Sequence, residues 1–309
     1  MKKQLLLALS FLLISGYASA QKEYKLAKST GRLTLNISGA IIEGYSGNEI
    51  IFTAKTTEDA EVDERAKGLR AISGSGFTDN TGLGIEVTEK GQEITVNTVS
   101  KKTDGELTIK VPQGIKVVFN NNGNALDQED ILVKNLKSEI EISTSFNKIR
   151  LENNTGPMNV KSLHGTIDAI FSGEIKGPVS IVSVYGYVDV TMPTATKANI
   201  ELSSSRGNLY AADAFKIAID KPEEKPVAKD RTDLKNVAVI ARAATQTKVN
   251  GLTINTGPNV KGLSTQVDGI SINNVYIGRD SENIKGKING GGTDLVFKSN
   301  FQNVYLRTK

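Results

Sequence analysis

The sequence predicts an all-β protein, specifically a parallel β-solenoid (a single-stranded β-helix) whose coils of roughly 18–21 residues each carry two short strands. The first observation is a recurring phrase: Ser or Thr, any residue, a large side chain, usually Gly or Asn, any residue, then two alternating, mostly aliphatic positions. It begins at residues 144, 162, 183 and 204, and a fifth copy begins at residue 299. A fixed period with strand-type alternation is typical of stacked repeats.

The second observation is the spacing of the predicted strands within the region 120–211. Strand starts follow one another at intervals of nine residues, with longer steps before Val179 and Ile200; they fall at Ile131, Ile140, Ile149, Met158, Ile167, Val179, Val188, Ile200 and Leu209. A hairpin meander or a β-sandwich would also alternate, but it would not repeat the same residue types at every second bend. Equivalent bends of a coil lie above one another, so the pattern favours the solenoid.

Composition provides the third observation, because 29 Gly and 7 Pro among 309 residues suit many tight turns and few helices. The first 20 residues lie outside the fold. Lys2 and Lys3, a short apolar run over 5–14 and the Ala18-Ser19-Ala20 site predict a cleaved secretory signal peptide, with an N-terminal membrane anchor as the alternative. No Cys lies at the cleavage point, so a lipid anchor is excluded, and no second apolar segment is long enough to span a membrane.

Residues 21–119 are predicted to form an N-terminal β region that continues or caps the solenoid. Alternation at Leu33, Leu35 and Ile37 indicates a strand with one buried face. Further strands are expected over 84–87, 94–96, 107–111 and 115–119, and a short exposed helix or helical turn over 56–69. Pro112 is expected to end its strand because proline cannot extend an internal ladder.

Two segments follow the repeats of 120–211. Residues 212–237, with the charged stretch Lys221 to Arg231, are predicted to be a partly polar insertion loop on the surface. Residues 238–309 are predicted to form C-terminal solenoid rungs and a cap, since 255–263 nearly copies 154–163 and the fifth phrase closes the chain. The polar, basic end suits an edge strand that should not recruit another strand, and Asn289 to Asp294 is expected to be a plain turn.

Composition also excludes several kinds of chemistry. There is no Cys, so disulfides, thiolate nucleophiles and Cys-ligated metals are impossible. The single histidine, His164, rules out a histidine-cluster metal site, and no Gly-rich loop ends in Gly-Lys-Ser/Thr. Lys and Arg number 38 against 34 Asp and Glu, without a basic block, so nucleic acid is not an expected partner. We therefore expect no catalytic residues, no cofactor and no metal.

One carboxylate pair keeps an enzymatic alternative open. Asp168 and Asp189 occupy equivalent positions in adjacent coils and should lie about one strand spacing, roughly 5 Å, apart. Such a pair could serve a polysaccharide lyase or hydrolase. The equivalent positions in neighbouring coils are Arg150 and Tyr210, and the alternation points all of these side chains outward, which favours a solvated face.

The large residue before each bend supplies the one candidate binding feature. Phe146, His164, Tyr185 and Arg206 should form a ladder along one edge of the stack, with Phe301 as the equivalent residue of the last phrase. Aromatic and arginine side chains on an exposed edge can contact a glycan or a partner protein. Alternatively, they stack on one another and cover the bend.

A family resemblance rests on the order of several turn and strand motifs along nearly all of the mature chain. The motifs are Glu43-Gly44-Tyr45 followed by Glu49-Ile50-Ile51, Gly68-Leu69 followed by Asp79-Asn80-Thr81-Gly82, Ile109-Lys110-Val111-Pro112, the Gly-centred repeats from Asn147 to Tyr210, and Ile288-Asn289-Gly290-Gly291-Gly292 through Val304-Tyr305-Leu306-Arg307. In this order they resemble a family of exported bacterial β-strand-repeat proteins that are labelled adhesins from their shape and whose function is uncharacterised. The resemblance implies a β-solenoid in the cell envelope and implies no known chemistry.

These observations lead to one functional expectation and two alternatives. We expect a non-enzymatic protein, exported to the periplasm or the cell surface, that presents a rigid surface for adhesion or for binding envelope components such as a cell-surface glycan or an envelope protein. The first alternative is a β-helix protein that binds or cleaves polysaccharide. The second is a passive structural partner in an envelope complex.

Overall fold

The computed structural model describes residues 22–54, 64–100, 106–123, 128–220, 245–249, 252–256 and 282–309. The predicted signal peptide, the charged stretch 221–231 and most of the copied phrase at 255–263 lie outside these residues. Of the helix expected over 56–69, the described part contains a single 3-10 turn, Glu64–Ala66.

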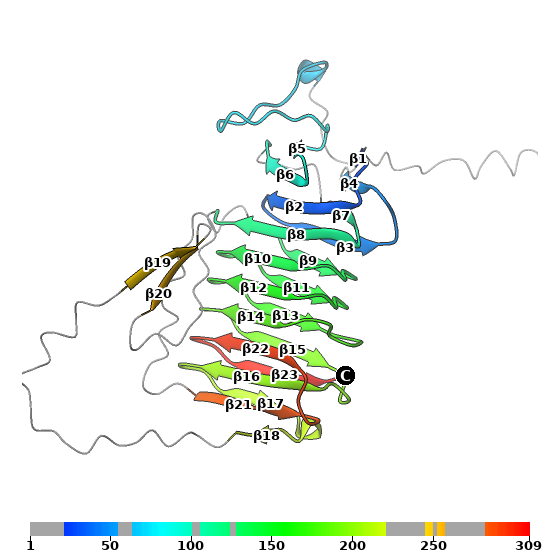
Figure 1. The fold of residues 1–309 in the computed structure, drawn as a ribbon. Coiled ribbons are helices and arrows are strands. Elements are labelled where there is room, and N and C mark those ends of the chain that lie inside the picture. Colours follow the sequence, from blue (N-terminus) through cyan, green and yellow to red (C-terminus); the bar gives the residue numbers. More distant parts are fainter. Residues whose placement is uncertain are drawn as a thin grey trace, which may run out of the picture.

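The chain folds into two long sheets whose strands run across a tall stack (Figure 1). The first, which we call the ladder sheet, has ten strands, in the order β1 (Lys22–Leu26), β4 (Ile50–Ala54), β7 (Leu107–Pro112), β3 (Ala40–Tyr45), β9 (Ile131–Lys134), β11 (Ile149–Glu152), β13 (Ile167–Ile170), β15 (Val188–Met192), β23 (Val304–Thr308) and β17 (Leu209–Ala211).

The second, which we call the opposite sheet, has eleven strands, in the order β18 (Ala218–Ile219), β21 (Glu282–Ile288), β16 (Ala198–Ser204), β22 (Thr293–Ser299), β14 (Val179–Ser183), β12 (Met158–Ser162), β10 (Ile140–Thr144), β8 (Gly114–Asn121), β2 (Thr30–Asn36), β6 (Glu93–Thr98) and β5 (Ile85–Lys90). β19 (Thr245–Val249) and β20 (Leu252–Thr256) form a separate two-stranded antiparallel sheet.

The predicted fold class is confirmed: the central coils form a parallel β-solenoid in which each coil gives one strand to each sheet. β10, β12 and β14 pair in parallel, as do β11, β13 and β15. Strands begin at the predicted residues throughout this region except at Ile200, where β16 begins two residues earlier at Ala198. Alternate residues point inward, so side chains such as Ile149 and Leu151 are buried between the sheets in one continuous core.

A buried hydroxyl explains why the recurring phrase needs Ser or Thr three residues before Gly. The Ser183 Oγ, which is fully buried, accepts a hydrogen bond from the Gly186 N–H at 2.9 Å and donates one to the Gly165 carbonyl oxygen of the neighbouring coil at 2.8 Å. A Cβ at Gly186 would lie 2.2 Å from that same carbonyl oxygen, so only glycine fits. Ser204 and Ser299 make the equivalent bonds in their coils.

The last strand of the chain does not form an edge of the stack, which corrects the edge strand expected at the polar, basic end. β22 lies between β14 and β16, and β23 lies between β15 and β17, with every one of these pairings parallel (Figure 1). β23 is therefore an internal strand with a partner on both sides. The prediction was wrong because repeat spacing reports that coils stack, and not in which order they stack.

The N-terminal region shows a matching departure from chain order. β2 pairs with β6 on one side and β8 on the other, and β3 lies between β7 and β9. The coil formed by β2 and β3 is therefore internal, because the later strands β6 and β7 lie outside it. Antiparallel strands are added beyond it, with β5 paired to β6, β4 paired to β7 and β1 paired to β4.

Residues 212–220 belong to the stack and not to the surface loop that we predicted to start at 212. A 3-10 turn, Asp213–Phe215, buries the Phe215 ring, and β18 then pairs antiparallel with β21. β21 in turn pairs antiparallel with β16. The prediction rested on the polar stretch after residue 220 and overlooked Phe215, the buried aromatic side chain that docks this segment. Across the described ranges, no helix is long and apolar enough to cross a membrane.

Candidate functional site

The edge ladder, which we define as Phe146, His164, Tyr185, Phe301 and Arg206, lies at the bend that leads into the ladder sheet. The four rings are spaced at 4.7, 4.6 and 4.6 Å between centroids, with interplanar angles from 5° to 17°. The Arg206 guanidinium carbon then lies 5.2 Å from the Phe301 ring centroid. The structure brings together the first three predicted residues, and it places Phe301 between Tyr185 and Arg206 because the last coil is inserted there.

The stacking decides which part of each ring a ligand can reach. At spacings near 4.6 Å, the faces of His164 and Tyr185 are in contact with their neighbours, so the outer edges of the rings provide the exposed area. Phe146 is 36% exposed, Tyr185 45% and Phe301 38%. A sugar that stacks on a ring face has no access to the inner rings, whereas a partner that contacts ring edges finds a continuous aromatic strip, in which the His164 nitrogens and the Tyr185 hydroxyl are polar.

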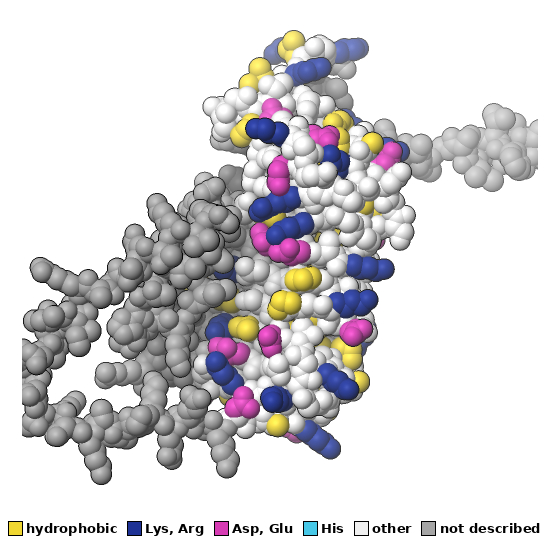
Figure 2. Space-filling model, in the orientation of Figure 1, with side chains coloured by type: hydrophobic (Ala, Val, Ile, Leu, Met, Phe, Trp, Pro, Cys, Tyr) yellow, Lys and Arg dark blue, Asp and Glu magenta, His cyan; other side chains and the backbone are white. Residues whose placement is uncertain are grey.

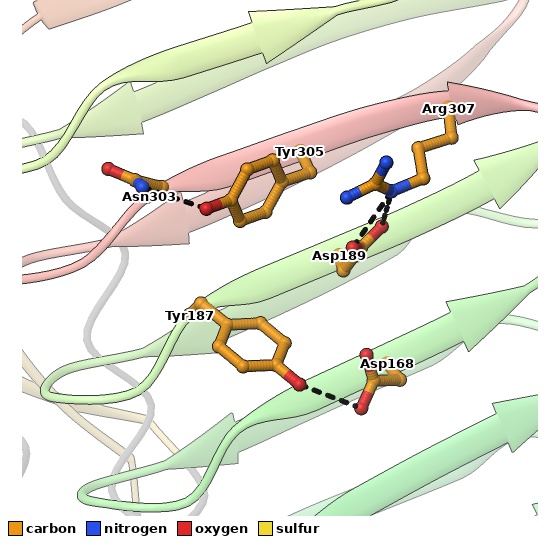
Figure 3. A network of polar contacts seen from close by, with 6 residues as sticks. All are labelled: Asp168, Tyr187, Asp189, Asn303, Tyr305 and Arg307. Atoms are coloured by element: carbon orange, nitrogen blue, oxygen red, sulfur yellow. Dashed lines mark hydrogen bonds and ion pairs between the residues drawn. The ribbon is translucent and has the colours of Figure 1, made fainter.

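A second cluster, which we call the face cluster, lies on the outer side of the ladder sheet beside this edge. Register pairing aligns the outward residues of five successive strands, in the order Arg150, Asp168, Asp189, Tyr305 and Tyr210. Each lies four positions after a member of the edge ladder, so both rows follow the same coils. Figure 3 shows the central part of the face cluster with Tyr187, Asn303 and Arg307.

Polar contacts tie the coils of the face cluster together (Figure 3). The Arg307 Nε donates to both carboxylate oxygens of Asp189, at 2.8 and 2.9 Å. The Tyr187 hydroxyl donates to Oδ2 of Asp168 at 3.4 Å. The expected stacking of the two carboxylates is observed, since Asp168 and Asp189 are register partners on adjacent strands.

Aromatic rings continue the row toward the end of the ladder sheet. Tyr210 stacks on Tyr305 at 5.3 Å with an interplanar angle of 9°, and Tyr187 meets Tyr305 edge-on at 6.3 Å. The Asn303 side-chain amide donates to the Tyr305 hydroxyl at 2.8 Å, and the Asn208 amide donates to that of Tyr210 at 3.1 Å. Each of these hydroxyls therefore retains its proton for donation to a ligand. Tyr210 is 48% exposed, and β17 is the last strand of the sheet.

The carboxylates differ in their electrostatic surroundings. Burial raises the pKa of Asp168, and the neighbouring Asp189 carboxylate raises it further, while Lys148 and Arg150 act in the opposite direction. Arg150 itself is ion-paired with Glu152 on its own strand. Arg307 balances the charge of Asp189, and its own pKa is raised by its hydrogen bond to that carboxylate.

Sequence reasoning missed the contributions of Tyr187, Tyr305 and Arg307. A signal for Tyr305 was present, because it occupies the same position of the fifth phrase that Asp189 and Tyr210 occupy in theirs. Arg307 was treated as part of a polar chain end, and only the insertion of β23 beside β15 brings it to Asp189. Within the part of the chain that the structure describes, no group of three or more His, Asp or Glu side chains is placed to hold a metal ion.

Comparison with known proteins assigns this chain to no family. Searches against protein-family models and against curated proteins returned no match. Among solved structures, this chain is similar to a "putative cell adhesion protein" from Clostridium sporogenes, at 13% sequence identity and a TM-score of 0.37, over 94% of this chain and 100% of the other. At these values the likeness carries no argument about function. The class is therefore defined by the coils themselves: a two-sheet β-solenoid with interleaved terminal coils.

Proposed function

We propose that the protein is an exported, non-enzymatic β-solenoid of the cell envelope that uses the ladder side of the stack as a rigid surface for adhesion or for binding envelope components. The observation that supports this proposal is the alignment of two rows, the edge ladder and the face cluster, over the same five coils. The sheet register fixes the side chains of these rows, so a ligand meets a surface that needs no ordering on binding.

The chemistry of the two rows suits a ligand with both apolar and hydroxyl-rich parts. The exposed ring edges offer apolar contact, and the tyrosine hydroxyls and the Asp168 carboxylate offer donors and acceptors. Figure 2 shows a face of the molecule on which basic and acidic side chains are interspersed. Pairs such as Lys116 with Glu139 and Lys298 with Glu201, on the opposite sheet, neutralise one another locally.

Polysaccharide cleavage is the second candidate, because Asp168 and Asp189 lie in register and the pKa of Asp168 is raised. The contacts of Asp189 argue against it. Both oxygens of Asp189 accept from the Arg307 guanidinium, a contact that a substrate would have to share or displace. Polysaccharide binding without cleavage remains compatible with the proposed surface.

The proposal is tested with the mature chain, residues 21–309, on a glycan array and on isolated envelope fractions. We expect binding that falls at least several-fold in the double variant Tyr210→Ala and Tyr305→Ala. A matched control, Val296→Ala, changes the outer face of the opposite sheet and should bind as the wild type does. Equal loss in the control, or no binding to any fraction, would refute the proposal.

A separate assay distinguishes binding from cleavage. Release of reducing ends from any bound polysaccharide is measured for the wild type and for Asp168→Asn. We expect no release by either protein. Release by the wild type that disappears in the variant would establish the enzymatic alternative instead.

A further inference from the structure

Part of the C-terminal segment 282–309, namely β22 and β23, occupies a slot that two other coils leave open between them, while β21 pairs with β16 and β18 beyond the slot. β14 and β16 do not pair with each other; both pair with β22, so that Leu295 lies in register between Val179 and Ile200. On the ladder sheet, β23 holds the same position between β15 and β17. The slot therefore has the height of one complete coil.

The connection between β15 and β16 leaves the space that forms the slot. Residues 193–197 lead from β15 to β16 and step past the position that the inserted coil fills. The side-chain amide of Asn289 donates to the carbonyl oxygens of Thr194 and Thr196, each at 2.8 Å. The segment thus contacts the connection that defines the slot, in addition to the strands on either side.

The segment is held in the slot by non-covalent contacts with the coils on both sides. Its inward residues Leu295, Phe297, Val304 and Leu306 are at most 1% exposed, so the segment brings its own share of the core. Ser299 donates to the Gly186 carbonyl on one side.

Ion pairs repeat this two-sided recognition. Lys298 pairs with Glu201 of β16 at 2.6 Å, and Arg307 pairs with Asp189 of β15. All of these contacts are made by residues 282–309, which follow the stacked residues 128–220 only after the long stretch 221–281. None of them depends on which copy of the chain supplies the segment.

We propose that the slot also takes β22 and β23 of a second copy of this chain, with β21 of that copy pairing beyond the slot, so that copies join by exchange of the 282–309 segment. Paired exchange gives a closed dimer, and one-way exchange gives an open row of solenoids. The energetic terms of insertion are the same in both arrangements, and the balance between them is set by protein concentration against the effective concentration that the connecting chain imposes. This proposal does not depend on the proposed binding function.

The test uses full mature chains that each carry a single cysteine, against a background without any cysteine. One chain carries Val182→Cys and an isotope-labelled second chain carries Lys298→Cys; these residues are register partners across β14 and β22. The chains are unfolded together, refolded at high concentration and oxidised. We expect disulfide-linked heterodimers in several-fold excess over a control mixture of Val182→Cys with Ser203→Cys, whose positions are separated by β22 in either arrangement.

Refolding of the unmodified chain provides a second, independent measurement. Light scattering after size-exclusion chromatography should show a dimer fraction that rises with the refolding concentration, while circular dichroism matches that of the monomer. Heterodimer yields equal to the control, or monomers alone at every concentration, would overturn the proposal. Either result leaves the binding assay of the wild-type monomer unaffected, so the two proposals fail separately.

Discussion

Replacing Ser183 by Ala tests whether the buried hydroxyl at each bend holds neighbouring coils together. The Ser183 Oγ is the partner of two backbone groups, the Gly186 N–H and the Gly165 carbonyl, and the side chain is 0% exposed. Alanine leaves both groups without a partner and out of reach of water. An unsatisfied buried polar group costs roughly 1–3 kcal/mol, so we expect a loss of about 2–4 kcal/mol in the free energy of unfolding.

The assay is urea denaturation followed by far-ultraviolet circular dichroism, since the protein has no tryptophan. Ser180→Ala is the matched control, because Ser180 lies on the same strand with its side chain on the half-buried outer face, and we expect a change within about 0.5 kcal/mol. Hydrogen exchange should show faster exchange of the Gly186 amide in the Ser183 variant. If Ser183→Ala matches its control in both measurements, the account of the bend is refuted.

Three further predictions follow from the same contacts. Gly186→Ala places a methyl group 2.2 Å from the Gly165 carbonyl oxygen and should lower the free energy of unfolding, measured by urea denaturation, by at least about 2 kcal/mol. In the control Gly173→Ala the methyl group meets no atom within 4 Å, so the change should be neutral or slightly stabilising. Equal effects would contradict the packing argument. Asp168→Asn should raise the midpoint of thermal unfolding at neutral pH. The folded state raises the pKa of this carboxyl, so the stability of the folded protein falls as the pH rises through that pKa. The gain should vanish at a pH below the ordinary pKa of aspartate, and a gain that persists in acid would disprove this cause. Phe301→Ala removes two stacking contacts and should cost about 1–3 kcal/mol, with no effect expected only if the edge ladder contributes nothing to stability.

Strand starts, inward side chains and the register between adjacent coils could be predicted from the sequence, because their pattern repeats in every coil. The nine-residue spacing placed β11 and β13 at their observed starts, and the alternation within each strand identified the inward side chains. The register that stacks Phe146, His164 and Tyr185 followed from the same spacing. These features depend on contacts between adjacent coils of similar length, and one sequence pattern reports all of them.

The order of the coils was not readable, and the face cluster depends on that order. The fifth phrase fits any position in the stack, because its Ser299 and Phe301 satisfy the same bend as every other copy. Its insertion beside β15 rests on complementary partners such as Arg307 for Asp189, which lie 118 positions apart in the sequence. The function of the edge ladder as a ligand contact stays a prediction.

Disulfide trapping within one chain tests the interleaved order of coils most directly. The double variant Val182→Cys and Lys298→Cys joins register partners on adjacent strands, about 4.8 Å apart and within the range that a disulfide bridges. The pair Val182→Cys and Ser203→Cys would be adjacent only if coils stacked in chain order. With β22 between them the two positions are about 9.6 Å apart, which a disulfide cannot span. We predict efficient intramolecular oxidation of the first pair with retained circular dichroism, and none of the second; the opposite result would contradict the interleaved solenoid.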